Sequence, residues 1–133
     1  MNLLKNALRA LPLLVLLLVA TTGCEPSYTE YYVRYVVGVK PGDTVNVTYQ
    51  DTNNKTPTIS QTISETSDET TVEAIVGPLY GGFCARLTAS VNGGQAPEFI
   101  RIEASENGAP YVTKVEQKGS TSISWAVPLE EDK

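Results

Sequence analysis

The fold is decided by the stretch Tyr31-Tyr32-Val33-Arg34-Tyr35-Val36-Val37-Gly38-Val39. Its odd-numbered positions are all tyrosine or valine, whereas the even-numbered positions include the charged Arg34. An apolar residue at every second position gives an extended strand one continuous apolar face. We therefore predict a long first β-strand with Tyr31 and Tyr35 in the core of the protein.

The same alternation recurs further along the chain. Residues 45–49 predict a second strand, and Lys40-Pro41-Gly42-Asp43 predicts a turn that pairs this strand with the first. The stretch 58–71 is rich in Ser and Thr, so we expect an edge strand there, followed by an acidic loop at 64–70.

More short strands are expected around residues 72–76, 83–91, 100–102, 111–115 and 123–127. The breaks between them are expected at glycine-containing turn signals: Gly77-Pro78, Gly81-Gly82, Asn92-Gly93-Gly94, Asn107-Gly108 and Lys118-Gly119. Seven or eight short strands with no amphipathic helix are typical of an antiparallel β-sandwich. The predicted fold class is therefore all-β, an immunoglobulin-like or transthyretin-like sandwich over residues 30–128.

The first 23 residues have the pattern of a signal peptide. The start is basic, residues 10–20 are apolar and rich in leucine, and Thr21-Thr22-Gly23 are small residues before Cys24. The apolar stretch is about half the roughly 20 residues that a membrane-spanning helix needs. Small residues that end in cysteine resemble a lipobox, so we predict cleavage before Cys24 and lipid on its sulfur. Ordinary secretion without lipid is the alternative.

Lipidation of Cys24 would make residues 24–29 a short tether and residues 129–133 an acidic tail. Three acyl chains would keep the domain on a membrane, because stable anchoring takes at least two signals. Cys84 would then have no partner for a disulfide. We expect Cys84 to be buried as a small apolar residue, although its position on the strand 83–91 is opposite the apolar face.

Charge and composition exclude several classes of function. Removal of residues 1–23 leaves eight bases against fifteen acids, a formal charge of −7. Such an acidic chain is not expected to bind nucleic acid, because proteins bind nucleic acid largely through Lys and Arg contacts to phosphate. The chain contains no histidine, so Ser-His-Asp and Cys-His sites are excluded, and no Gly-rich phosphate loop precedes a helix. We predict no enzymatic activity and no cofactor.

Two acidic segments are candidates for a calcium site. Asp51-Thr52-Asn53-Asn54-Lys55 has a lysine at the third ligand position and lacks the glycine and final glutamate of a calcium loop, so it predicts an Asx-rich turn. The acids Glu65, Asp68, Glu69 and Glu73 have no spacing known for a metal loop, and a solvated face is expected. We predict no metal site.

Four runs and a hairpin carry a resemblance: Tyr31-Tyr32-Val33-Arg34-Tyr35, Val45-Asn46-Val47-Thr48-Tyr49, Phe83-Cys84-Ala85-Arg86-Leu87, Ile100-Arg101-Ile102 and the turn Asn107-Gly108. In this order they resemble small envelope lipoproteins of Gram-negative gut anaerobes, which are similar to mycobacterial small membrane proteins of the MmpS type. The resemblance covers nearly all of the mature chain. It implies a β-sandwich outside the membrane and, for the mycobacterial members, partnership with lipid transporters. It assigns no role to individual residues.

Other features bear on partners. Asp43-Thr44-Val45 matches the short pattern on which such anaerobes attach O-glycans, and a turn residue that opens a strand explains it equally well. Tyr28, Tyr32 and Tyr80 lie near loops or off the apolar face, where they could contact a sugar ring or a partner protein; isolated surface tyrosines are the alternative.

These features together predict a lipid-anchored, non-catalytic lipoprotein of the cell envelope, and we expect it at the outer membrane, on a leaflet that the sequence does not specify. Its expected role is that of a protein-interaction accessory of an envelope or transport complex. The alternative is a carbohydrate-binding module at the cell surface.

Overall fold

Eight strands form where apolar and polar residues alternate in the sequence. The computed structural model describes residues 28–129. Its strands are β1 (Tyr31–Gly38), β2 (Thr44–Tyr49), β3 (Thr58–Thr62), β4 (Thr71–Leu79), β5 (Cys84–Val91), β6 (Ile100–Glu106), β7 (Val112–Gln117) and β8 (Ser122–Ala126). Every strand pairing is antiparallel. No helix long and apolar enough to cross a membrane occurs within this range.

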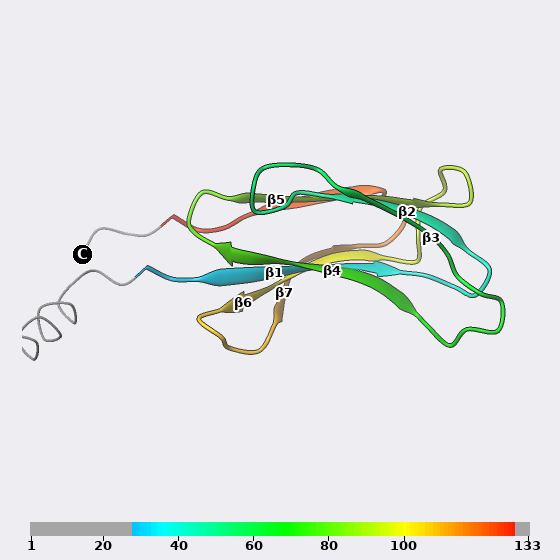
Figure 1. The fold of residues 1–133 in the computed structure, drawn as a ribbon, viewed down its shortest axis with the longest axis horizontal. Helices are drawn as coiled ribbons and strands as arrows, with labels where there is room; N and C mark the ends of the chain where they lie inside the picture. Colours follow the sequence, from blue (N-terminus) through cyan, green and yellow to red (C-terminus); the bar gives the residue numbers. More distant parts are fainter. Residues whose placement is uncertain (1–27, 130–133) are drawn as a thin grey trace, which may run out of the picture.

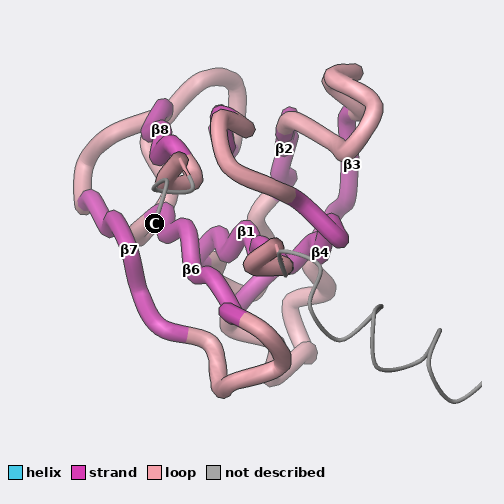
Figure 2. Tube along the Cα trace, turned by 90° about the vertical axis from the view of Figure 1, so that its left-hand side faces the viewer, coloured by secondary structure: helices cyan, strands magenta, loops and turns pink. Residues whose placement is uncertain are grey.

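The strands divide into two four-stranded sheets with the orders β4-β1-β6-β7 and β3-β2-β5-β8. The sheets form the two layers seen in Figure 1, and Figure 2 views them from one end. Hairpins join β2 to β3 and β6 to β7, whereas the other connections cross from one sheet to the other. The predicted all-β, antiparallel β-sandwich is confirmed, and so is the edge position of β3.

The predicted hairpin between the first two strands is wrong. β1 pairs with β4 and β6, so that Tyr35 lies opposite Ala74 on one side and Ile102 on the other, and β2 belongs to the opposite sheet. An alternating apolar pattern is the same whether a strand pairs with its sequence neighbour in a hairpin or lies in the opposite sheet of the sandwich. The first strand also pairs differently from that of an immunoglobulin constant domain, whose first strand lies beside the second.

The predicted break at Gly77-Pro78 is also wrong, because β4 continues to Leu79. The pairing of β1 with β4 shifts register here, between Tyr31 and Val33. A Cβ atom at Gly77 would lie 2.4 Å from Cδ2 of Tyr32, and the φ of Gly77 is +154°. Glycine therefore lets the Tyr32 ring lie against the backbone of β4. Pro78 fits because β4 is an edge strand, where a ladder hydrogen bond is not needed.

The core lies between the two sheets and is built from the predicted alternating positions. Tyr31 and Tyr35 are 8 % and 1 % exposed, which confirms their core assignment. Tyr35 packs against Tyr49, and Tyr31 meets Trp125 edge to face. The remaining buried core residues are aliphatic: Val33, Val37, Val39, Val45, Val47, Ile63, Val72, Val76, Leu79, Ala85, Leu87, Ala89, Val91, Ile100, Ile102, Ala104, Ile123 and Val127.

The described chain begins and ends at the same end of the sandwich, which we call the terminal end (left in Figure 1). The loops 50–57, 80–83 and 107–111 lie at this end as well. Backbone hydrogen bonds join Gly82 and Phe83 to Val127, and Glu30 to Asn107, so they hold both chain ends against these loops. The predicted signal peptide (1–23), Cys24 and residues 130–133 lie outside the described residues.

Candidate functional site

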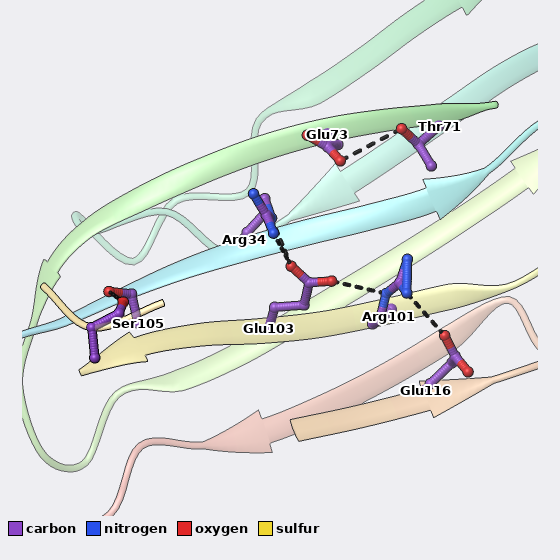
Figure 3. A network of polar contacts seen from close by, with 8 residues as sticks. Arg34, Thr71, Glu73, Arg101, Glu103, Ser105 and Glu116 are labelled. Atoms are coloured by element: carbon purple, nitrogen blue, oxygen red, sulfur yellow. Dashed lines mark hydrogen bonds and ion pairs between the residues drawn. The ribbon is translucent and has the colours of Figure 1, made fainter. Parts of the chain in front are cut away.

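The outer face of the sheet β4-β1-β6-β7 carries a chain of ion pairs, and we call it the paired face. Arg34 Nη2 lies 2.6 Å from Glu103 Oε1, and Arg101 Nε lies 3.0 Å from Glu103 Oε2. Arg101 Nη1 lies 3.4 Å from Glu116 Oε1. Figure 3 shows these side chains crossing β1, β6 and β7. The register predicts the arrangement, because Arg34 is opposite Glu103 and Arg101 is opposite Glu116.

Glu103 is the centre of this chain and is only 8 % exposed. Arg101 Nε is close enough to Glu103 for an ion pair but is not aligned to donate a hydrogen bond to it. Val36, on the same outer face between Glu73 and Arg101, is 1 % exposed. The stems of long charged side chains can cover apolar surface in this way. The paired charges on this face therefore act as part of the structure.

Aromatic and aliphatic groups surround the ion pairs. The guanidinium of Arg34 lies 4.3 Å from the centroid of Tyr111, and that of Arg101 lies 4.7 Å from the centroid of Phe99. Ile75, opposite Arg34 on the edge strand β4, is 57 % exposed, and Tyr32 is 37 % exposed. The paired face therefore has an exposed apolar corner at Ile75 and Tyr32.

The outer face of the sheet β3-β2-β5-β8 has a different composition, and we call it the neutral face. Its four strands contain no Asp or Glu, and their one charged residue is Arg86. Hydroxyl and amide groups meet across the strands: Thr48 with Thr58 at 3.1 Å, and Ser60 donating to Asn46 Oδ1 at 2.8 Å. No carboxylate of residues 28–129 forms an ion pair with Arg86.

A pocket of about 410 Å³ lies between the loops 50–57 and 80–83 of the terminal end and the start of β5 on the neutral face. It is lined by Gln50, Thr52, Asn54, Tyr80, Gly81, Gly82, Phe83, Cys84 and Arg86. The lining contains one cation and no carboxylate. The lining therefore holds two aromatic rings, two side-chain amides, two hydroxyls, a thiol and a guanidinium.

Hydrogen bonds tie one wall of this pocket to the core. The hydroxyl of Tyr35 donates to the backbone oxygen of Gln50 at 2.7 Å, and the backbone N–H of Gln50 donates to the backbone oxygen of Arg86 at 3.0 Å. Burial raises the pKa of the Tyr35 phenol well above its usual range, so the hydroxyl remains a donor even at alkaline pH. These contacts connect the position of Gln50 to the sandwich interior.

The loop beside the pocket is the predicted Asx-rich turn. Asp51 Oδ1 accepts hydrogen bonds from the backbone N–H groups of Asn53 and Lys55 at 2.9 and 2.8 Å. Asn54 adopts a φ of +58°, and its Oδ1 lies 3.4 Å from Gln50 Nε2. The carboxylate of Asp51 thus closes its own loop. Over residues 28–129 no three acidic or sulfur side chains are grouped to hold a metal ion.

The structure separates the three candidate tyrosines. Tyr80 lines the pocket and is 47 % exposed, Tyr32 lies on the paired face over Gly77, and Tyr28 is 66 % exposed at the start of the described chain. Gln50, Asn54 and Arg86 belong to the pocket but were not predicted. The available signal was the absence of acids from the strands that became β2, β3, β5 and β8.

Two other expectations are resolved by position. The expectation that Cys84 is buried is wrong, because the residue is partly exposed and lines the pocket. Cys84 lies on the outer face of β5, whereas Ala85 and Leu87 lie on the face that packs in the core. Asp43 is a turn residue that accepts hydrogen bonds from Lys40 and Asn92, and Thr44 is exposed at the start of β2. The turn therefore accounts for Asp43 structurally.

No protein-family model matches this chain, and no curated protein matches it.

Proposed function

We propose that this protein is a lipid-anchored lipoprotein of the cell envelope, at the outer membrane, and that its sandwich is a non-catalytic module that binds a protein of an envelope or transport complex. Its ligand-binding surface in this role is the exposed corner of the paired face, formed by Ile75 and Tyr32 beside Arg34. The resemblance to small envelope lipoproteins supports the same role.

The anchor is supported by the distance between the lipidated residue and the domain. Tyr28 follows Cys24 by four residues, a stretch of chain that spans at most about 14 Å. A lipid on Cys24 would hold the terminal end close to the membrane and leave the paired face free along the side of the sandwich. Lateral contact with a membrane-bound partner suits that geometry.

The observation that carries the interaction role is the exposure of Ile75 and Tyr32 next to an arginine. Tyrosine and arginine are enriched in protein interfaces, and hot spots cluster around buried aromatic and arginine anchors. Arg34 is already oriented by Glu103 and by the Tyr111 ring. A partner that covers this corner would bury apolar surface without having to order the arginine.

Metabolic labelling with a fatty acid tests the anchor. The wild-type protein should incorporate label and partition into detergent, and Cys24→Ala should lose the label because the sulfur that carries the lipid is absent. Cys84→Ala is the matched control and should be labelled like the wild type. Equal labelling of wild type and Cys24→Ala, or no label in the wild type, would refute lipidation.

Cross-linking in intact cells, followed by purification, tests the interaction surface. Ile75→Asp places a charge in the exposed corner and should abolish the cross-linked partner. Val112→Asp is the matched control, since Val112 is 56 % exposed on the other edge strand, β7. Loss of the partner in both variants, or in neither, would contradict the proposed surface. Carbohydrate binding, the alternative role that the sequence leaves open, would use a separate surface, the pocket at the terminal end.

A further inference from the structure

We infer that the pocket at the terminal end binds a sugar that carries a carboxylate, as in an acidic oligosaccharide. Arg86 would hold the carboxylate, Gln50 and Asn54 would bind ring hydroxyls, and Tyr80 would lie against the face of the ring. This assignment does not depend on the lipid anchor or on the partner proposed for the paired face.

The charge distribution is the first argument. The mature chain is strongly acidic, yet the strands of the neutral face contain no acid and the pocket lining contains none. Arg86 is the one cation of that lining and has no ion pair within residues 28–129. Arg34 and Arg101, in contrast, are neutralised by glutamates. A guanidinium without an ion pair among residues 28–129, in a pocket whose described lining has no carboxylate, favours an anionic group.

The other lining groups favour a sugar over a simple anion. Gln50 and Asn54 each offer an amide that can both donate and accept, and Thr52 offers a hydroxyl. Tyr80 is exposed enough to present its ring, and aromatic rings combine an apolar face with a polar handle. A volume of about 410 Å³ lies within the usual range for small-molecule sites. Phosphate alone would leave most of these groups without a contact.

The pocket is also preorganised. Gln50 is held through its backbone by Tyr35 and Arg86, and Asn54 is held in a turn closed by Asp51. Gly81 and Gly82 leave room between Tyr80 and the start of β5. Groups held in place before binding lose less conformational freedom when the ligand arrives.

The test uses the full-length protein in detergent and a panel of acidic oligosaccharides containing glucuronate, galacturonate or N-acetylneuraminate. Titration calorimetry measures affinity, and saturation-transfer NMR identifies the sugar protons in contact with the protein. At least one acidic oligosaccharide should bind saturably, and its neutral counterpart, with the carboxylate reduced to an alcohol, should bind at least about tenfold more weakly. Equal affinity for the neutral counterpart, or no saturable binding by any member of the panel, would overturn the inference.

Two substitutions localise the ligand. Arg86→Gln should weaken binding of the acidic sugar by at least about tenfold, the loss expected when a hydrogen bond to a charged group is removed. Tyr80→Ala should reduce saturation transfer to the ring protons. The matched control is Lys118→Gln, which removes one positive charge from a turn outside the pocket and should leave affinity unchanged. An equal loss in Lys118→Gln would show that overall charge, not the pocket, holds the sugar.

Cys84 provides an independent probe, since its thiol lines the same pocket. Modification with a bulky maleimide should abolish sugar binding in the wild type and leave Cys84→Ser unaffected. Unchanged binding after Cys84 is fully modified would place the ligand elsewhere. Inorganic phosphate at the same concentration should not compete; full competition would show a simple anion site and overturn the assignment of a sugar.

Discussion

The two outer faces of the sandwich hold their charges in opposite ways. On the paired face, Arg34 and Arg101 converge on Glu103, and Arg101 also reaches Glu116. On the neutral face, Arg86 stands among hydroxyl and amide side chains without a carboxylate partner in the described part of the chain. Both faces belong to the same small fold and are built from strands of similar length.

The charged side chains of the paired face contribute to the stability of the fold, whereas the guanidinium of Arg86 is available to a ligand. A buried ionic group is costly when its partner is removed, so the paired face must keep its ions together to remain folded. An exposed arginine without a partner contributes little to folding and is free to meet a ligand. The two faces should therefore respond differently to loss of charge, and four changes probe that difference.

The largest effect is expected for Glu103→Gln. This change leaves Arg34 and Arg101 side by side without the carboxylate that both contact, and it should lower the free energy of unfolding by about 3 kcal/mol. Urea denaturation measures the loss. Glu116→Gln is the control, because Glu116 is 40 % exposed at the side chain and contacts Arg101 alone; about 0.5 kcal/mol is expected. Equal losses in the two variants would mean that burial of Glu103 is unimportant.

Gly77→Ala should cost about 2 kcal/mol, because its methyl group would meet the Tyr32 ring and its backbone would be strained. Thermal or urea unfolding measures the change. In the double variant Tyr32→Ala/Gly77→Ala the clash is removed, so the losses should be clearly less than additive. Strict additivity would show that Tyr32 does not pack on Gly77 in solution, and it would free Tyr32 for a purely ligand-binding role.

Tyr35→Phe should lower the free energy of unfolding by about 1 kcal/mol at pH 7, because the backbone oxygen of Gln50 loses its donor. The pH dependence carries more information. Burial raises the pKa of folded Tyr35, whereas the unfolded residue ionises near pH 10. Its contribution is therefore complete below about pH 10 and is lost as pH rises above that value.

Unfolding of the wild type and of Tyr35→Phe should be compared from about pH 8 to about pH 11, a range around the usual tyrosine pKa of about 10. Stability should fall more steeply above pH 10 in the wild type than in the variant. Parallel curves would show that Tyr35 is accessible to solvent and that the pocket wall is not tied to the core.

The smallest effect is expected for Arg86→Gln, which should change the free energy of unfolding by less than about 0.5 kcal/mol. Its side chain is exposed on the neutral face and breaks no ion pair within residues 28–129. A loss near that of Glu103→Gln in the same urea titration would show that Arg86 is a structural charge after all, and the contrast between the faces would disappear.

Much of the fold could be predicted because apolar and polar residues alternate along each segment that forms a strand. The buried positions of β2 and β5 are those that the period of two selects, β1 buries Val36 and Gly38 in addition to them, and Asn107-Gly108 forms its turn with both residues at positive φ. The pairing of β1 could not be predicted, since a core-facing strand satisfies the same pattern in either sheet. The prediction at Gly77 is wrong for a related reason. Glycine is typical of a break between two strands, but here it allows the Tyr32 ring to lie close to the backbone of β4.

The candidate site was less accessible to prediction. Tyr80 was selected from its place beside a loop, and it does line the pocket. Tyr28, near a loop, and Tyr32, off the apolar face of the first strand, are predicted contacts as well, and both lie outside the pocket lining. Arg86 could not be predicted because a single arginine carries no motif; its significance comes from forming no ion pair within residues 28–129, which is a property of its spatial neighbours.

The sequence by itself determined the fold class, the core-facing residues and the edge position of β3, because each depends on residues that are close along the chain. Only the tertiary structure decided that β1 and β2 belong to opposite sheets, that two arginines share Glu103, and that Gln50, Thr52 and Asn54 line a pocket together with residues 80–84 and 86. These features depend on which segments of the chain lie together in space. The packing of the two sheets decides this, and the local alternation of apolar and polar residues is the same in either arrangement.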